Sequence, residues 1–307
     1  MENGLEVYLL PKIGFEKTYG LFSTRFGSID TTFVPLGQKE MIKVEDGIAH
    51  FLEHKLFENE DGTDASTLFA KTGADVNAFT TANQTAYLFS ATNSINDNIE
   101  SLLDFVQEPC FKKASIDKER GIIEQELLMY LDQPQSVLYF GLLKSLYKKN
   151  NVRNEIGGSV ESIKQINEEL LYQCYHTFYH PKNMVFCVVG NFDKDELIEL
   201  IKSNQSRKTF GEFKPITRKY YLEDGEVNEK HQFTEMDVSI PKVTVGVKIP
   251  YEKLTPYEIL KKTIAIEILT DLYFDESANV YEKLMNSRVI NNSFEYDVYF
   301  EETYRHI

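Results

Sequence analysis

The residues best suited to chemistry stand together in the segment His50-Phe51-Leu52-Glu53-His54. On a helix His50 and His54 share one face, so both imidazoles can reach a single ion. Zinc suits this pair, because imidazole nitrogens bind it at about 2.0–2.1 Å and a catalytic zinc keeps three protein ligands and a water. Glu53 lies on the edge of the same face, where its carboxylate can accept a proton from that water. The segment predicts a zinc site with Glu53 as general base.

A third protein ligand is needed, and the predicted helix after Ser115 offers three glutamates. Glu119 and Glu126 are seven residues apart and share a face, whereas Glu124 points away from Glu126 by about 160°. The burial of a carboxylate costs free energy unless it meets a cation. The alternative is that these glutamates form an ordinary helix face exposed to solvent. Spacing alone therefore leaves Glu119 and Glu126 open as ligands. The alternative to a metal site is an amphipathic helix on which both histidines have ordinary hydrogen-bond partners.

The pattern His-x-x-Glu-His is the inverted zincin signature. Together with the helix that contains Glu119 and Glu126, it resembles the pitrilysin/insulinase family of metallopeptidases. In that family the third ligand is the second glutamate of a Glu-x6-Glu helix, some seventy residues after the second histidine. Here the interval from His54 to Glu126 is 126 minus 54, or 72 residues. The resemblance implies that Glu126 binds the metal and that Glu119 is a catalytic-site carboxylate that orients the ligands.

Three further segments are similar to the same family. Asn3 to Val7 resembles its opening strand, and Tyr179 to Met184 followed by Val188 to Asn191 resembles its Tyr-x-Pro-x-Asn-Met…Val-Gly element. Gly73 to Thr80 resembles its substrate-binding edge strand, which implies that Asn77 and Ala78 contact the substrate. Within the family, the small bacterial members and the β subunit of mitochondrial processing peptidase are the most similar in these motifs.

Composition limits the classes of partner. The chain of 307 residues carries 33 basic and 48 acidic side chains, a net charge of -15. No cationic surface is predicted, which argues against nucleic acid as a partner. No apolar run approaches the roughly 20 residues that span a bilayer, so no membrane segment is expected. Three widely spaced cysteines without a CxxC pattern are typical of a reducing compartment, and we expect a cytoplasmic protein.

The order of predicted elements indicates an α+β protein, in which an antiparallel sheet has helices packed on one face. Alternating strands open the chain, helices occupy much of residues 47–178, and a strand at Met184 to Val189 precedes another helix. Further strands are expected at Val238 to Ile249 and at Phe294 to Phe300, around a helix that begins at Thr255-Pro256. The family implies the metallohydrolase fold of the processing-peptidase type, followed by a partial second copy.

The expected domains are a zinc-binding catalytic domain at 1–208, a polar linker at 209–232, and a second α+β domain at 233–307. The second domain would have 75 residues, whereas the family carries two domains of similar size. We therefore expect the chain to be a fragment of a longer polypeptide, with an incomplete second domain.

The family also implies a partner. Its self-sufficient members carry in the second domain an Arg followed seven residues later by a Tyr, which reach the zinc site. Here Met285 and Asn292 take those positions, and neither can replace the lost donors. Arg288 and Tyr296 lie nearby but are eight residues apart instead of seven. On a strand this extra residue turns one of the two side chains to the other face. We expect a heterodimer with a homologous, zinc-free subunit that supplies Arg and Tyr; a homodimer, or a further C-terminal segment, is the rival.

The predicted function is that of a zinc-dependent endopeptidase acting on peptides or small unfolded polypeptides. Two alternatives remain: a non-catalytic structural subunit of the same fold, and an inverted-zincin lyase that acts on a small molecule. The first alternative usually lacks a ligand or the base, and lyases of that type lack the distant Glu-x6-Glu helix.

Overall fold

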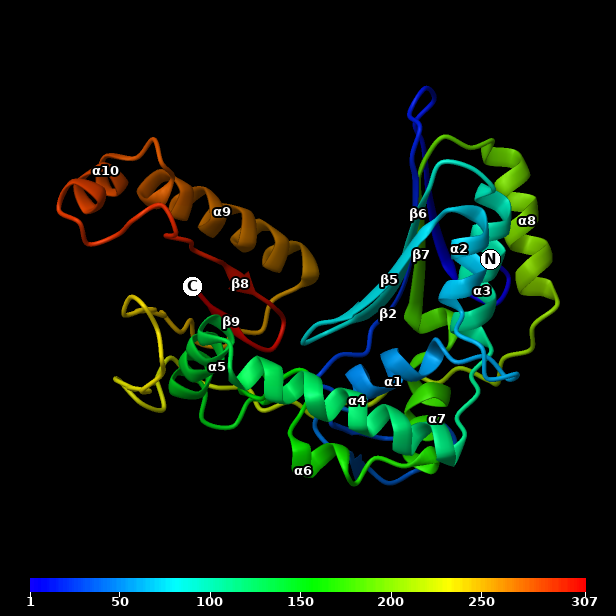
Figure 1. Ribbon diagram of the computed structural model, residues 1–307, viewed down its shortest axis with the longest axis horizontal. Helices are drawn as coiled ribbons and strands as arrows, with labels where there is room; N and C mark the ends of the chain where they lie inside the picture. Colours follow the sequence, from blue (N-terminus) through cyan, green and yellow to red (C-terminus); the bar gives the residue numbers. More distant parts are fainter. The chain divides into compact units, whose positions relative to one another are not determined.

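The computed structural model describes every residue from Met1 to Ile307 and divides into two compact units (Figure 1). Unit 1 comprises Met1–Asp132 and Asn154–Lys219, and unit 2 comprises Gln133–Arg153 and Tyr220–Ile307. The chain therefore leaves unit 1 once, returns to it, and ends in unit 2.

Unit 1 is built on a sheet of five strands. Their order across the sheet is β1 (Glu6–Pro11), β7 (Met184–Gly190), β2 (Thr18–Thr24), β6 (Thr85–Ala91) and β5 (Asp75–Thr80). The pair β1–β7 is parallel and the other pairs are antiparallel. Two short strands, β3 (Thr32–Phe33) and β4 (Ile42–Lys43), pair separately. Strand β5 pairs only with β6, so it forms an edge of the sheet.

Helices cover one face of this sheet (Figure 1): α2 (Ser66–Thr72), α3 (Ile95–Gln107) and α8 (Lys194–Ser206). Apolar residues recur at helical spacing along α3, and Ile99, Leu102 and Val106 are fully buried. Asp193 caps α8 by accepting from the backbone N–H of Glu196. The opposite face carries exposed apolar side chains, among them Tyr8.

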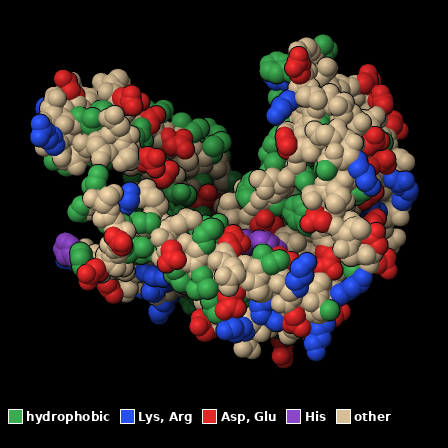
Figure 2. Space-filling model, in the orientation of Figure 1, with side chains coloured by type: hydrophobic (Ala, Val, Ile, Leu, Met, Phe, Trp, Pro, Cys, Tyr) green, Lys and Arg blue, Asp and Glu red, His purple; other side chains and the backbone are tan.

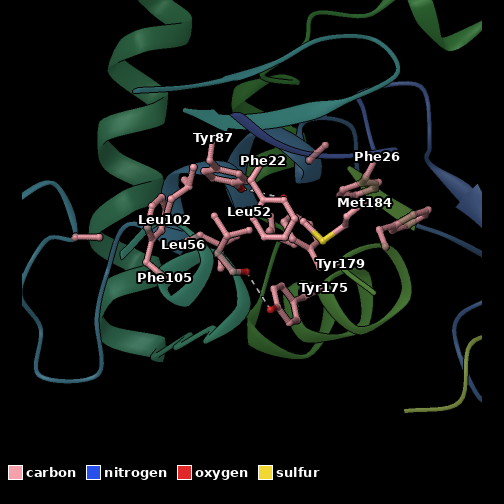
Figure 3. Packing of buried hydrophobic residues seen from close by; sticks show 14 of the residues in the cluster. Phe22, Phe26, Leu52, Leu56, Tyr87, Leu102, Phe105, Tyr175, Tyr179 and Met184 are labelled. Atoms are coloured by element: carbon pink, nitrogen blue, oxygen red, sulfur yellow. Dashed lines mark hydrogen bonds between the residues drawn. The ribbon is translucent and has the colours of Figure 1, made fainter. Parts of the chain in front are cut away.

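The remaining helical segments of unit 1 lie beyond one end of the sheet. They are α1 (Ile48–Leu56), α4 (Lys113–Leu131), α6 (Val160–Ile163), α7 (Glu168–Phe178) and the short η2 (Pro181–Asn183). An aromatic core joins them to the strands (Figure 3), with Phe26 stacked on Phe178 at 4.1 Å between ring centroids. The buried hydroxyls of Tyr87 and Tyr179 hydrogen-bond to each other at 2.9 Å, so these two phenols satisfy one another.

Helices are the longest regular elements of unit 2. It contains α5 (Pro134–Leu146), η1 (Asn151–Arg153), α9 (Pro256–Phe274), α10 (Asn279–Asn286), β8 (Tyr299–Phe300) and β9 (Arg305–His306). Helix α9 begins after Thr255 with Pro256 at its first position, as the sequence predicts, and Glu258 completes a capping box with Thr255. Buried polar contacts hold the unit together: the hydroxyl of Tyr147 donates to the Arg305 carbonyl at 2.9 Å.

The structure confirms the α+β class with helices packed on one face of the central sheet. The sheet is not wholly antiparallel, because β7 returns to lie beside β1 and runs parallel to it. The strand predicted at Val238 to Ile249 is wrong: only a bridge from Lys248 to His306 forms there, and Val243 and Val245 are exposed without a paired strand. The strand predicted from Phe294 is reduced to Tyr299–Phe300.

Compact units and predicted domains divide the chain at different places. Residues 133–153 group with unit 2, because Tyr147 contacts Arg305 and because Gly246 packs against Leu142 and Leu146 of α5. The division into 1–208, 209–232 and 233–307 stays a prediction about domains. None of the helices has both the length and the apolar character that a membrane crossing demands.

Candidate metal centre

Helix α1 carries the first three candidate residues. Its N-cap is Gly47 at φ 89°, where a Cβ would collide with the Gly157 carbonyl, so the loop at Gly157 can lie directly against the start of the helix. Ile48, Phe51 and Leu52 bury the opposite side of α1. The helix is thereby fixed in rotation, and the side chains of His50, Glu53 and His54 face α4 and β5.

The candidate ligands come together in space. Nε2 of His54 lies 3.5 Å from Oε2 of Glu126, and Nε2 of His50 lies 3.8 Å from the same oxygen. One ligand atom from each of the three residues can be chosen so that all lie within 4.8 Å of one another. Ligands about 2.0–2.1 Å from a tetrahedral zinc are roughly 3.3–3.4 Å apart. Two imidazoles and a carboxylate at these distances fit zinc after a small contraction.

Glu119 contacts the second histidine from behind. Its Oε1 lies 3.0 Å from Nδ1 of His54, and Glu119 is about two helical turns before Glu126 on the same face of α4. A carboxylate at Nδ1 orients the ring and leaves Nε2 directed at Glu126. Of the two glutamates that spacing left open, Glu126 is the one that lies near Nε2 of both histidines.

The two histidines differ in pKa because their surroundings differ. Burial, followed by the neighbouring His54, lowers the pKa of His50 to about 3, and its Nδ1 is buried without a hydrogen-bond partner. Burial also lowers the pKa of His54, but the hydrogen bond to Glu119 and the charges of Glu53, Glu119 and Glu126 outweigh it and raise the pKa. His50 is therefore neutral at neutral pH, the form that binds a metal.

Glu53 directly precedes His54 on α1 and is 7% exposed. Burial raises its pKa above the usual value, although a hydrogen bond from Thr80 opposes this. That bond joins Thr80 Oγ1 to Glu53 Oε2 at 2.5 Å. A carboxylate with a raised pKa accepts a proton more readily than an exposed one.

The cluster can be reached from the surface. The side chains of His50, His54 and Glu126 are 14%, 24% and 23% exposed, and Figure 2 shows histidine and acidic side chains together at the surface near α1. Tyr130 lies one turn after Glu126 on α4, and its hydroxyl donates to the Glu126 carboxylate. Burial, followed by the charge and the hydrogen bond of Glu126, raises the pKa of Tyr130. Neither Thr80 nor Tyr130 was predicted as a site residue, because only the fold brings them to Glu53 and Glu126.

Comparison with known proteins identifies the family. Residues 33–159, which contain the whole cluster, match the family model described as "Insulinase (Peptidase family M16)", and residues 165–292 match "Peptidase M16 inactive domain". The zinc protease YmfH of Bacillus subtilis is 46% identical over 97% of this chain and 69% of its own length. The chain belongs to the insulinase family of peptidases. The resemblance predicted from the sequence is confirmed.

Two further proteins show the extent of the likeness. A crystal structure of an M16-like peptidase from Alicyclobacillus acidocaldarius superposes with a TM-score of 0.95 at 37% identity, over 100% of this chain and 71% of that one. The β subunit of mitochondrial processing peptidase from Bos taurus is 29% identical over 66% of this chain and 40% of its own length. The chain therefore spans only part of each of these relatives.

Strand β5, which the resemblance matches to a substrate-binding strand, is an open edge of the sheet. Its open side faces away from β6, and Asn77 is exposed there. The Asn77 side-chain oxygen accepts from the backbone N–H of Ala78 at 2.9 Å. Because Thr80 at the end of the same strand contacts Glu53, one end of this edge lies beside the cluster.

The residues that the resemblance matches to the family's Arg and Tyr lie in unit 2. Met285 is on α10, and Asn292 is exposed. Arg288 is also exposed and has a left-handed φ of 59°, and the hydroxyl of Tyr296 donates to Asp271 at 2.9 Å. Arg288 and Tyr296 thus lie on an irregular segment, not on a regular strand.

Proposed function

We propose that this chain is the zinc-binding catalytic part of a metalloendopeptidase of the insulinase family. His50, His54 and Glu126 hold one Zn²⁺, Glu53 is the general base, and Glu119 orients His54. The observation that supports it most is the convergence of three ligand atoms within 4.8 Å, with Glu53 one residue away from a ligand on the same helix.

Bound zinc would polarise a peptide carbonyl and lower the pKa of a water. The chain's own contribution is to hold a proton acceptor next to it. Glu53 accepts the hydrogen bond of Thr80 at Oε2, which leaves Oε1 to take the proton and later pass it to the leaving amine. The raised pKa of Glu53 suits both transfers, because a strongly acidic carboxyl group would bind the proton poorly.

The substrate would bind along β5. An extended peptide can add to the open edge by main-chain hydrogen bonds, with Asn77 and Ala78 as its contacts. Backbone recognition makes little use of side chains, so we expect loose sequence selectivity.

A homologous, zinc-free subunit would complete the site. Met285 offers no hydrogen-bond donor and Asn292 lacks a phenol, so the Arg and Tyr must come from elsewhere. The loss of one such transition-state donor costs about 2.7–4 kcal/mol, which would leave the lone chain very slow. The bovine relative is itself named as a subunit, which supports an assembly. The test compares peptide cleavage by the chain alone with cleavage after mixing with the candidate partner; full activity alone, unchanged by mixing, would contradict the heterodimer.

The metal site is tested by elemental analysis of the purified protein. We expect one zinc per chain, and loss of zinc when His50, His54 or Glu126 is replaced by Ala. Glu124→Ala on the same helix is the matched control and should retain zinc. Retention of a full equivalent by His54→Ala would refute the site. A zinc-loaded assembly that cleaves nothing in a mixed peptide library would instead identify a non-catalytic subunit.

A further inference from the structure

Thr80 is the last residue of β5 and contacts the carboxylate of Glu53. Its Oγ1 donates to Glu53 Oε2 at 2.5 Å and lies 3.3 Å from Oγ1 of Thr85, the residue directly opposite on β6. Thr85 is fully buried, and its hydroxyl donates to the carbonyl oxygen of Phe26 at 2.8 Å. A chain of polar contacts therefore runs from the buried backbone at Phe26 to Glu53.

We propose that Thr80 is a positioning residue that fixes the Glu53 carboxylate for proton transfer. This inference rests on the proposed function, since it gives Glu53 the role of base. Thr80 does not touch the ligands or the reacting atoms; it acts only through Glu53.

The geometry explains why a threonine suits this position. A β-branched side chain on a strand has restricted χ1, so the Thr80 hydroxyl is held in one direction. Val76, Ala78 and Thr80 alternate with the outward Asp75, Asn77 and Phe79, so Thr80 points towards α1. The hydroxyl then restricts Glu53, which has three rotatable bonds and would otherwise sample several carboxylate positions. Groups at a catalytic centre must be held within about 0.5 Å of the productive geometry.

The same strand also carries the proposed substrate contacts. Asn77 and Ala78 lie three and two residues before Thr80 on β5. A peptide added to the open edge and the carboxylate that activates water are thus held by a single strand. We therefore expect Thr80 to affect the rate of turnover far more than the binding of peptide.

The first experiment measures kcat, KM and zinc content in the active, zinc-loaded assembly. Thr80→Val removes the hydroxyl at nearly constant shape, and outer partners at metal sites typically contribute about 10–100-fold. We expect kcat to fall by that factor with KM and zinc content unchanged, and Thr80→Ser to restore kcat to within about threefold. Thr81→Val is the matched control, because the Thr81 hydroxyl bonds only within its own loop to Asn83 and Gln84, and it should keep wild-type kcat.

The second experiment uses the metal-free chain and does not depend on turnover. Thr80→Val should lower the urea unfolding midpoint when Glu53 is present, and should change it little in a Glu53→Ala background. Equal shifts in both backgrounds would show that the two side chains do not interact, which would overturn the inference. A Thr80→Ser protein as slow as Thr80→Val would also overturn it, because packing of the methyl group would then be the cause.

Failure of this inference can be told apart from failure of the proposed function. If Glu53→Gln is inactive while Thr80→Val keeps wild-type kcat and zinc, only the role of Thr80 is wrong. If Glu53→Gln is fully active, the role of the base itself is wrong.

Discussion

Each unit contains a largely buried glutamate, and the two glutamates differ in the number of hydrogen bonds that they accept. Glu53 of unit 1 is 7% exposed and accepts one hydrogen bond, from Thr80. Glu223 of unit 2 has a side chain 9% exposed, and it accepts the ammonium of Lys248 at 2.7 Å. It also accepts three consecutive backbone N–H groups, those of Lys148, Lys149 and Asn150.

The pKa values follow from these partners. Burial raises the pKa of Glu53, and the single bond from Thr80 only partly opposes it. Burial alone would also raise the pKa of Glu223, but the bond from Lys248 and the three backbone donors lower it to about 2. A carboxylate with every lone pair satisfied stabilises the fold, whereas one with few donors stays available to accept a proton.

Removal of the Glu53 charge should produce the largest effect. We expect Glu53→Gln to lower kcat by about 10²–10⁴-fold, the usual contribution of a general base, with zinc content unchanged. The amide keeps the shape and still accepts from Thr80, so stability should change little. Peptide turnover and zinc analysis measure this, and an active Glu53→Gln protein would remove the contrast between the two glutamates.

The matching change in unit 2 should act on stability instead. Glu223→Gln leaves the buried Lys248 ammonium without its counter-charge, and the loss of one partner of a buried pair costs about 3–5 kcal/mol. Urea unfolding measures this loss. Glu226→Gln is the control, since the Glu226 side chain is 78% exposed and its pair with Lys148 is worth about 0–1 kcal/mol. Equal effects from the two variants would contradict a special role for Glu223.

The contribution of Glu223 to the free energy of unfolding should depend on pH in the acid range. The folded pKa is about 2 and the ordinary value is 4.5, so this stabilisation is complete above about pH 4.5 and is lost as pH falls towards 2. Wild type and Glu223→Gln should therefore differ most above pH 4.5 and converge in more acidic solution. Free energies of unfolding across this range test the prediction, and a constant difference down to pH 2 would contradict it.

The smallest effect is expected at Glu119. Glu119→Gln keeps an acceptor for the ring nitrogen of His54 but loses the charge, and such partners contribute about 10–100-fold to metal affinity. Zinc affinity should fall by that factor, while Glu124→Gln on the same helix leaves it unchanged. Competition with a chelator measures both variants.

Much of the site could be predicted from the sequence, because its ligands come from local helical spacing. Positions four apart on α1 bring His50 and His54 together whatever the rest of the fold does. The family resemblance added Glu126, and the structure places it near both rings. Spacing within α4 could not separate Glu119 from Glu126, since both lie on one face and only the packing of α4 against α1 distinguishes them.

What only the tertiary structure decided depends on contacts between distant segments. Val238 to Ile249 alternates as a strand should, but a strand requires a neighbour, and here only the end of the segment, Val247 to Ile249, pairs with the backbone of Arg305 to Ile307. The parallel return of β1 beside β7 joins residues almost 180 positions apart, which no local pattern records. Likewise, alternation along β5 predicts which residues share a face with Thr80, but it does not show that this face meets Glu53. The proposed ligands can therefore be predicted largely from local spacing, whereas the surroundings of Glu53 are determined by how β5 packs against α1.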